Sequence, residues 1–387
     1  MVVAADSVTG KSDDFVRWRY LAVVNLVVIF GHLAYKIHDN LPGLAYAHLL
    51  VDYHFGFIKR GLAGAALSLA FDHVPQWPGK VLASAAVLVT FALYLRLFSR
   101  TFGFRREHVT TFVFIVGSPF FFKNFIHAFG YFDIYGCAVA ILLLLAPGKS
   151  PYYVVGATFS CVVLIVIHQV HLILYVPTIV SIVIIRHFLS QHDLTRAQIA
   201  KGAFALAFLI ATCVYMQFFT DVHVSQAQFA AHMQERMASD GLPTSLAFDY
   251  VWFMTIRDQF QETWNAMGDH WRLWYISYPI AFVIHWPLIR CVIRSINQIS
   301  VARHRQIILF LAAGVTLCYL VLFLIAFDYA RYIGDWFVCM ILLFHAVLQL
   351  PSSAKPEPIP LDDRRAFWLA IPLSVLPRVG ILRPFNL

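Results

Sequence analysis

Apolar residues fall into ten runs separated by short polar connections. A helix needs about 20 apolar residues to cross a bilayer, and about 17 at the short end. The runs cover roughly 20–37, 80–97, 108–124, 132–147, 152–170, 172–188, 202–219, 273–290, 306–327 and 334–350. This pattern predicts an all-α integral membrane protein with about ten transmembrane helices, because backbone polar groups in lipid must be satisfied within each segment.

The positions of the basic residues predict the orientation of these helices. With 55–72 left as a non-spanning segment and the N-terminus in the cytoplasm, most of the 29 lysines and arginines lie in cytoplasmic connections, as the positive-inside rule requires. If 55–72 crossed the membrane, the basic cluster at 96–106 would move outside. We therefore expect a multi-pass protein with both termini in the cytoplasm.

The connections divide unevenly between the two sides. Two long outer loops are predicted, at about 38–79 and 220–272, and the first is expected to carry short helices at the membrane interface. Residues 1–350 form one membrane domain on this interpretation. Residues 351–387 form a cytoplasmic tail, which we expect to lie against the interface.

The composition excludes several classes of protein. Apolar residues make up 60% of the chain and charged residues only 13%, against about 25% charged in soluble domains. A soluble, disordered or nucleic-acid-binding protein is excluded, and the net charge of +8 follows from membrane insertion without a polyanionic partner. The six cysteines lie in apolar runs without metal-ligand spacing, so we expect no metal, cofactor or disulfide.

Polar side chains gather at the predicted outer ends of the spans, where their cost at membrane depth makes them informative. Together they resemble the lining of an outward-facing pocket. The candidate site residues are Asp52, His54, Lys59, Arg60, Lys123, Asp133, His168, His171, Asp328 and Arg331.

Each candidate also has a structural alternative. Asp328 and Arg331 are three residues apart and suit an internal ion pair. Asp133 suits a helix N-terminus. His168 and His171 suit hydrogen bonds between helices, and the basic pair at 59–60 suits contacts with lipid headgroups.

The chemistry that fits this set is glycosyl transfer from a lipid (di)phosphate. Lys59, Arg60, Lys123 and Arg331 would bind the phosphate of the leaving group. A carboxylate, Asp52 first and Asp133 second, would take the proton from an attacking sugar hydroxyl. The other pocket residues would be His54, His168, His171 and Asp328. Aromatic side chains suited to stacking on sugar rings are Tyr131, Trp252, Trp264, Trp271 and Trp274.

Two short runs, DYHFGFIKRG at 52–61 and FDYARYIGDW at 327–336, resemble bacterial polysaccharide polymerases of the Wzy and EpsG type. The layout also resembles that of the GT-C membrane glycosyltransferases, whose long first outer loop carries interfacial helices and a catalytic Asp. That resemblance implies Asp39 or Asp52 in this role and Asp133 as a second acid. It implies a polyprenyl-linked sugar donor, a glycan or lipid-linked acceptor and a bacterial inner (cytoplasmic) membrane, with surrounding lipids as the other partners and no nucleic acid.

Two other functions remain open. The sequence RGLA at 60–63 resembles the start of the acyltransferase type 3 family, with His73 two residues beyond the family's histidine position, which is Phe71 here. A membrane O-acyltransferase that modifies a glycan is therefore one alternative. A lipid-linked sugar transporter or flippase is the other, although such proteins tend to place polar groups at the bilayer midplane and to show internal repeats.

Overall fold

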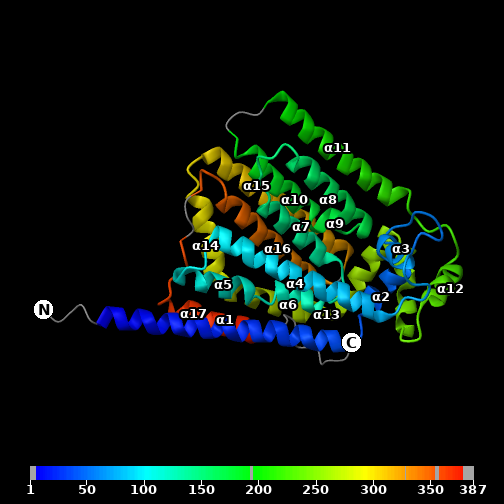
Figure 1. The fold of residues 1–387 in the computed structure, drawn as a ribbon, viewed down its shortest axis with the longest axis horizontal. Helices are drawn as coiled ribbons and strands as arrows, with labels where there is room; N and C mark the ends of the chain where they lie inside the picture. Colours follow the sequence, from blue (N-terminus) through cyan, green and yellow to red (C-terminus); the bar gives the residue numbers. More distant parts are fainter. Residues whose placement is uncertain (1–5, 192–194, 327, 354–356, 378–387) are drawn as a thin grey trace.

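The protein is a bundle of helices whose long axes run side by side (Figure 1). The computed structural model describes residues 6–191, 195–326, 328–353 and 357–377, without the side chains of 6–12, 244–245 and 266–277. Six helical segments are long and apolar enough to cross a membrane. They are α1 (Asp6–His38, from Asp13), α4 (Gln76–Thr101), α11 (Arg196–Phe218), α15 (Ala302–Ile325), α16 (Tyr329–Leu348), and His171–Phe188, which combines α9 (His171–Leu174), α10 (Val176–Val183) and η2 (Ile184–Phe188).

Other apolar segments are bent or short. The end of α13 (Ile256–Ile284) and α14 (Trp286–Asn297) meet at an angle of 64° and add a seventh span if they count as one. The helices α7 (Asp133–Leu145) and α8 (Tyr153–Ile167) are apolar but shorter than 18 residues. The described part of the chain therefore supports a multi-pass helical membrane protein, while the predicted number of ten spans is not confirmed.

The run predicted at 108–124 does not form one helix. It follows a short 3₁₀ turn, η1 (Arg106–His108), and divides into α5 (Val109–Val116) and α6 (Phe122–His127). Pro119 lies in the gap. A proline has no N–H to donate and disfavours helical geometry in the residue before it, so the helix ends ahead of it.

Most of the non-spanning elements gather at one end of the bundle, which carries residues 39–75 and 219–255 and which we call the loop-rich end (Figure 1). It contains α2 (Gly43–Leu50), α3 (Leu62–Ser68), α12 (Gln226–Arg236) and η3 (Pro243–Trp252). Within the segment 55–72, the only helix is α3, which is too short to cross a bilayer.

The second long loop is shorter than predicted. Helix α13 begins at Ile256, because Thr255 and Asp258 form a reciprocal capping box in which each side chain binds the other's backbone N–H. This arrangement satisfies two N–H groups at the start of the helix. The connection therefore ends near residue 255 and not near 272.

The C-terminal tail packs against the bundle. Helix α17 (Arg364–Val375) lies along α1 and buries Ala366 and Ala370. The indole Nε1 of Trp18 donates a hydrogen bond to the carbonyl of Leu361 at 2.9 Å. The part of the tail that the structure describes is therefore integrated into the helical core.

Candidate functional site

A cavity of about 1040 Å³ lies at the loop-rich end of the bundle. Its wall combines α2, the turn at 59–60, the α8–α9 connection, residues 248–262 and the start of α16. We call it the charged cavity, because four cationic side chains and three carboxylates line it. They are Lys59, Arg60, Arg257, Arg331, Asp221, Glu262 and Asp328.

Arg331 is the most strongly held of these cations. It lies in the first turn of α16 and is 9% exposed. Its Nε is 3.0 Å from Oδ2 of Asp133, and its Nη1 is 3.4 Å from Oδ2 of Asp328. It donates a hydrogen bond to the hydroxyl of Tyr332 at 2.6 Å, and its guanidinium carbon lies 4.5 Å from the ring centre of Tyr131. Arg331 is therefore fixed on several sides before any ligand binds.

Arg60 is held by its backbone and not by an ion pair. Its φ of 65° is in the left-handed region, which costs a non-glycine residue about 1–3 kcal/mol and is typical of functional sites. The preceding residue is fixed from two directions: the carbonyl of Lys59 accepts from Trp252 Nε1 at 3.1 Å, and its N–H donates to the carbonyl of Thr220 at 3.2 Å. This arrangement places the strained turn firmly on the cavity wall.

The charge of Arg60 has no local counterion among the described residues, since no carboxylate there lies within 4 Å of its nitrogens. Its guanidinium carbon lies 5.9 Å from the Trp252 ring centre. Burial, together with the charge of Arg331, lowers the pKa of Arg60 to about 10, so the side chain stays charged at neutral pH. A half-buried cation without a carboxylate partner is an attractive anion-binding group.

His48 brings a further polar group to the same wall. Its side chain is 1% exposed, and neither ring nitrogen has a hydrogen-bond partner in the structure. Its ring lies 5.3 Å from that of His168 and 5.4 Å from that of Trp252. Burial, and then the charges of Arg60 and Arg331, hold the pKa of His48 well below its ordinary value. The neutral ring therefore offers a ligand one donor and one acceptor.

The structure brings together half of the residues proposed from the sequence. Lys59, Arg60, His168, Asp328 and Arg331 all line the charged cavity. The remaining five do not line it, and they are Asp52, His54, Lys123, Asp133 and His171. Of these, Asp133 touches the site through its ion pair with Arg331.

Asp52 connects the first loop to α12. Its Oδ1 accepts from Nε2 of His232 at 3.0 Å and from the backbone N–H of His54 at 2.9 Å, and its Oδ2 lies 3.0 Å from Nη1 of Arg236. Arg236 also donates to the carbonyl of Leu50 at 2.7 Å. Burial alone raises the pKa of Asp52, but the two hydrogen bonds and the Arg236 charge outweigh it and lower the pKa. Both carboxylate oxygens are engaged, which favours a positioning role over the predicted role as base.

Lys123 is also engaged away from the cavity. Its Nζ donates to the carbonyls of Gly117 at 3.0 Å, Leu373 at 2.7 Å and Ser374 at 3.0 Å. These bonds use all three ammonium donors, so the predicted phosphate contact has no support in this geometry. His171 is fully buried inside the bundle, and a role in ligand contact has no support there either.

Several residues on the wall were not predicted. His48 interrupts an otherwise apolar stretch of α2, which is a signal that sequence alone could have supplied. Asp221 lies in the second long loop and Arg257 in the first turn of α13, and no pattern distinguished them. Among the aromatics proposed for sugar stacking, Tyr131 and Trp252 line the cavity.

The other aromatic predictions have different outcomes. Trp264 is 60% exposed and lies off the wall, while the side chains of Trp271 and Trp274 lie outside the described residues.

Comparisons with known protein families, curated proteins and solved structures find no match for this chain. Its function must therefore be inferred from its own geometry.

Proposed function

We propose that this protein is a membrane glycosyltransferase that takes its sugar from a polyprenyl-(di)phosphate carrier on the outer face of a bacterial cytoplasmic membrane. The product would be an extended or polymerised surface polysaccharide, with a glycan or lipid-linked acceptor. The observation that carries the proposal is the charged cavity, where Arg60, Arg331 and the unpartnered His48 lie together. Buried, convergent polar groups of this kind are typical of ligand sites.

The cations would stabilise the leaving group. As the bond between the anomeric carbon and the phosphate oxygen breaks, the electron pair goes to that oxygen and negative charge develops on the (di)phosphate. Arg60, which has no carboxylate within 4 Å in the described structure, and the prearranged Arg331 would bind this charge. Guanidinium groups suit the task because they bind phosphate through two parallel hydrogen bonds.

Asp328 is the carboxylate best placed to activate the acceptor. Its side chain is 43% exposed, lies on the cavity wall and is 3.4 Å from Arg331. It would accept the proton from an acceptor hydroxyl while the oxygen bonds to the anomeric carbon. We prefer it to Asp52 because that side chain is bound on both oxygens and does not line the cavity.

The acyltransferase alternative has less support. Its histidine, His73, lies at the surface, and its Nδ1 is 2.7 Å from the carbonyl oxygen of Glu235. It does not line the charged cavity. The transporter alternative is tested separately, with the protein reconstituted in liposomes and a labelled lipid-linked sugar.

The test uses purified protein in nanodiscs with a polyprenyl-diphosphate-linked sugar and a matching acceptor, and detects the new glycosidic bond by mass spectrometry. We expect Arg60→Gln to lower the transfer rate at least about 100-fold. Arg96→Gln, an exposed position outside the cavity, is the matched control and should keep full activity. Movement of the labelled lipid across liposomes without bond formation would instead establish a transporter.

A further inference from the structure

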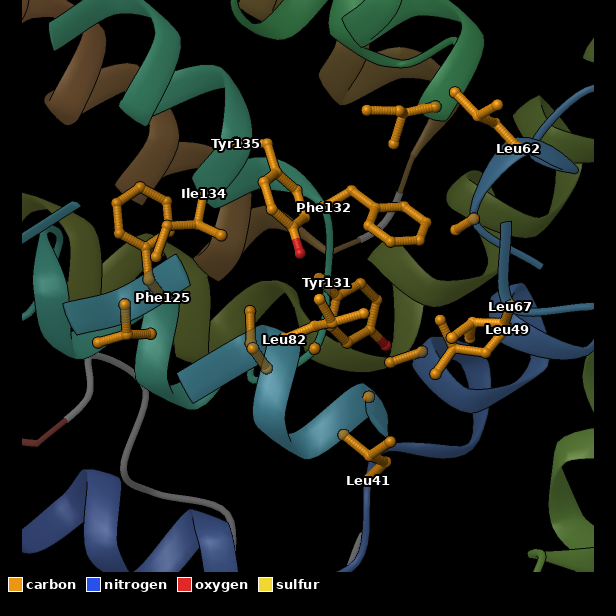
Figure 2. A pocket seen from close by; sticks show the side chains of 18 of the residues that line it. Leu41, Leu49, Leu62, Leu67, Leu82, Phe125, Tyr131, Phe132, Ile134 and Tyr135 are labelled. Atoms are coloured by element: carbon orange, nitrogen blue, oxygen red, sulfur yellow. The ribbon is translucent and has the colours of Figure 1, made fainter. Parts of the chain in front are cut away.

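A second cavity, of about 410 Å³, lies between α2, α3, α4 and α7. We call it the apolar cavity, because the side chains that line it are almost entirely hydrocarbon (Figure 2). Leu41, Leu49, Leu67, Leu82 and Phe125 all contribute to its wall. None of the described residues that line it carries a charged side chain.

Helix α2 separates the two cavities. Leu44 and His48, one turn apart, line the charged cavity. Ala45 and Leu49, each one residue later, line the apolar cavity. Because residues four apart share one helix face, the two neighbouring faces of α2 serve two chemically different spaces.

Tyr131 lies where the two cavities adjoin, since it lines both. Figure 2 shows its ring among the apolar side chains. Its ring centre is 4.5 Å from the guanidinium carbon of Arg331. One aromatic side chain therefore links the hydrocarbon space to the most rigidly held cation of the charged cavity.

The apolar cavity opens at its α3 and α4 side. Ala66 lines it and is exposed, and Leu82 lines it and is 48% exposed. Nearer the start of α4 the wall is tight: a Cβ added to Gly79 would lie 2.5 Å from a methyl carbon of Leu49 and 2.6 Å from one of Leu41. The space is thus an apolar groove that is exposed beside Ala66 and Leu82 and adjoins the charged cavity at Tyr131.

We infer that the apolar cavity holds the hydrocarbon chain of the same lipid whose phosphate binds in the charged cavity. This inference rests on the proposed function and adds a chain-binding subsite to it. A lipid phosphate has an anionic end joined to an apolar chain, and the adjoining cavities present complementary surfaces in that order. The chain enters beside Ala66 and Leu82, and Tyr131 packs where chain and phosphate meet.

The test measures binding of undecaprenyl phosphate and of the short geranyl phosphate to the purified protein in detergent, by competition against a fluorescent polyprenyl phosphate. We expect the wild type to bind the long chain at least about tenfold more tightly, because the longer chain makes more van der Waals contacts along the groove. Ala66→Phe should narrow the mouth and remove this preference while leaving geranyl phosphate binding unchanged. Ala70→Phe, at an exposed position outside the cavity, is the matched control and should keep the preference.

Arg60→Gln separates the two claims, because it should weaken both ligands by the same factor. Equal binding of long and short chains to the wild type, or a chain preference that survives Ala66→Phe, would overturn the chain subsite and leave the proposed function standing. Absence of binding by either ligand would overturn the lipid-phosphate substrate together with the subsite.

Discussion

Nε of Arg331 and Oδ2 of Asp133 lie 3.0 Å apart, with both side chains buried in the bundle. The two residues are far apart in the sequence and come from α16 and α7. Asp133 does not line the charged cavity, so its effect on a ligand is exerted through the orientation of the guanidinium.

Replacing Arg331 alone should destabilise the protein more than replacing both members of this pair. Arg331→Gln alone leaves the Asp133 carboxylate buried without its cation, for which we expect a loss of about 3–5 kcal/mol. Asp133→Asn alone should cost less, because Arg331 keeps Asp328 as a partner at 3.4 Å. The double variant leaves neither charge and should recover part of that loss. Thermal unfolding of the detergent-solubilised protein measures all four proteins, and strictly additive losses would contradict the coupling.

Replacing Asp328 and replacing Asp52 should have different effects in an activity assay. Asp328→Asn should lower the transfer rate at least about 100-fold, because the proposed base is lost. Asp52→Asn should retain most of the rate, since Asp52 acts only by holding the first loop to α12. The reverse order of effects would return the base role to Asp52.

Asp52 should stabilise the fold at neutral pH and lose this effect in acid. Its pKa is lowered in the folded protein, so its contribution is fully present above the unfolded value of about 3.9 and is lost as pH falls through the folded value. Asp52→Asn removes this contribution. The melting temperature of the variant should therefore be lower than that of the wild type at pH 6, and the difference should shrink as the pH falls below about 4. A constant difference across that range would contradict the linkage.

Replacing Arg60 with glycine should remove lipid phosphate binding without lowering thermal stability. Arg60→Gly relieves the backbone cost of the left-handed conformation, about 1–3 kcal/mol, and removes the unpaired charge. We expect equal or higher thermal stability with loss of lipid phosphate binding. Arg60→Ala is the control, because it removes the same charge and keeps a β-carbon at the strained φ of 65°; equal melting temperatures for the two variants would argue against strain.

Lys123 should hold α17, the C-terminal helix, in place through its hydrogen bonds. Lys123→Met leaves three buried carbonyls without their charged donor, and we expect a net loss of about 3 kcal/mol after relief of the buried charge. Faster amide exchange in α17 would locate the effect. Lys149→Met, at an exposed position, should change neither quantity.

Apolar periodicity predicted the helices that are long and uninterrupted. The runs at 80–97, 202–219 and 306–327 correspond to α4, α11 and α15, because a long apolar stretch has few structures open to it in lipid. The run at 108–124 failed as a single helix at Pro119, whose effect a hydropathy window averages away. Uninterrupted apolar runs therefore form the predicted helices, and Pro119 explains why the run at 108–124 does not.

The candidate site could be predicted only in part. Lys59, Arg60 and Arg331 were identifiable as charges next to apolar runs, and all three line the charged cavity. The partners that separate Asp52 and Lys123 from it lie on α12 and α17, far away in the sequence. Such long-range pairing depends on the packing of the helices, which no spacing within one segment encodes.

The placement of α2 between the two cavities has a consequence for how this chain tolerates changes of length. An α-helix turns by about 100° for each residue. One residue inserted after Ala45 would rotate His48 away from its neighbours on the polar side and aim Leu49 elsewhere, with no loop inside the helix to absorb the change. The register of α2 must therefore be kept if His48 and Leu49 are to line two different cavities.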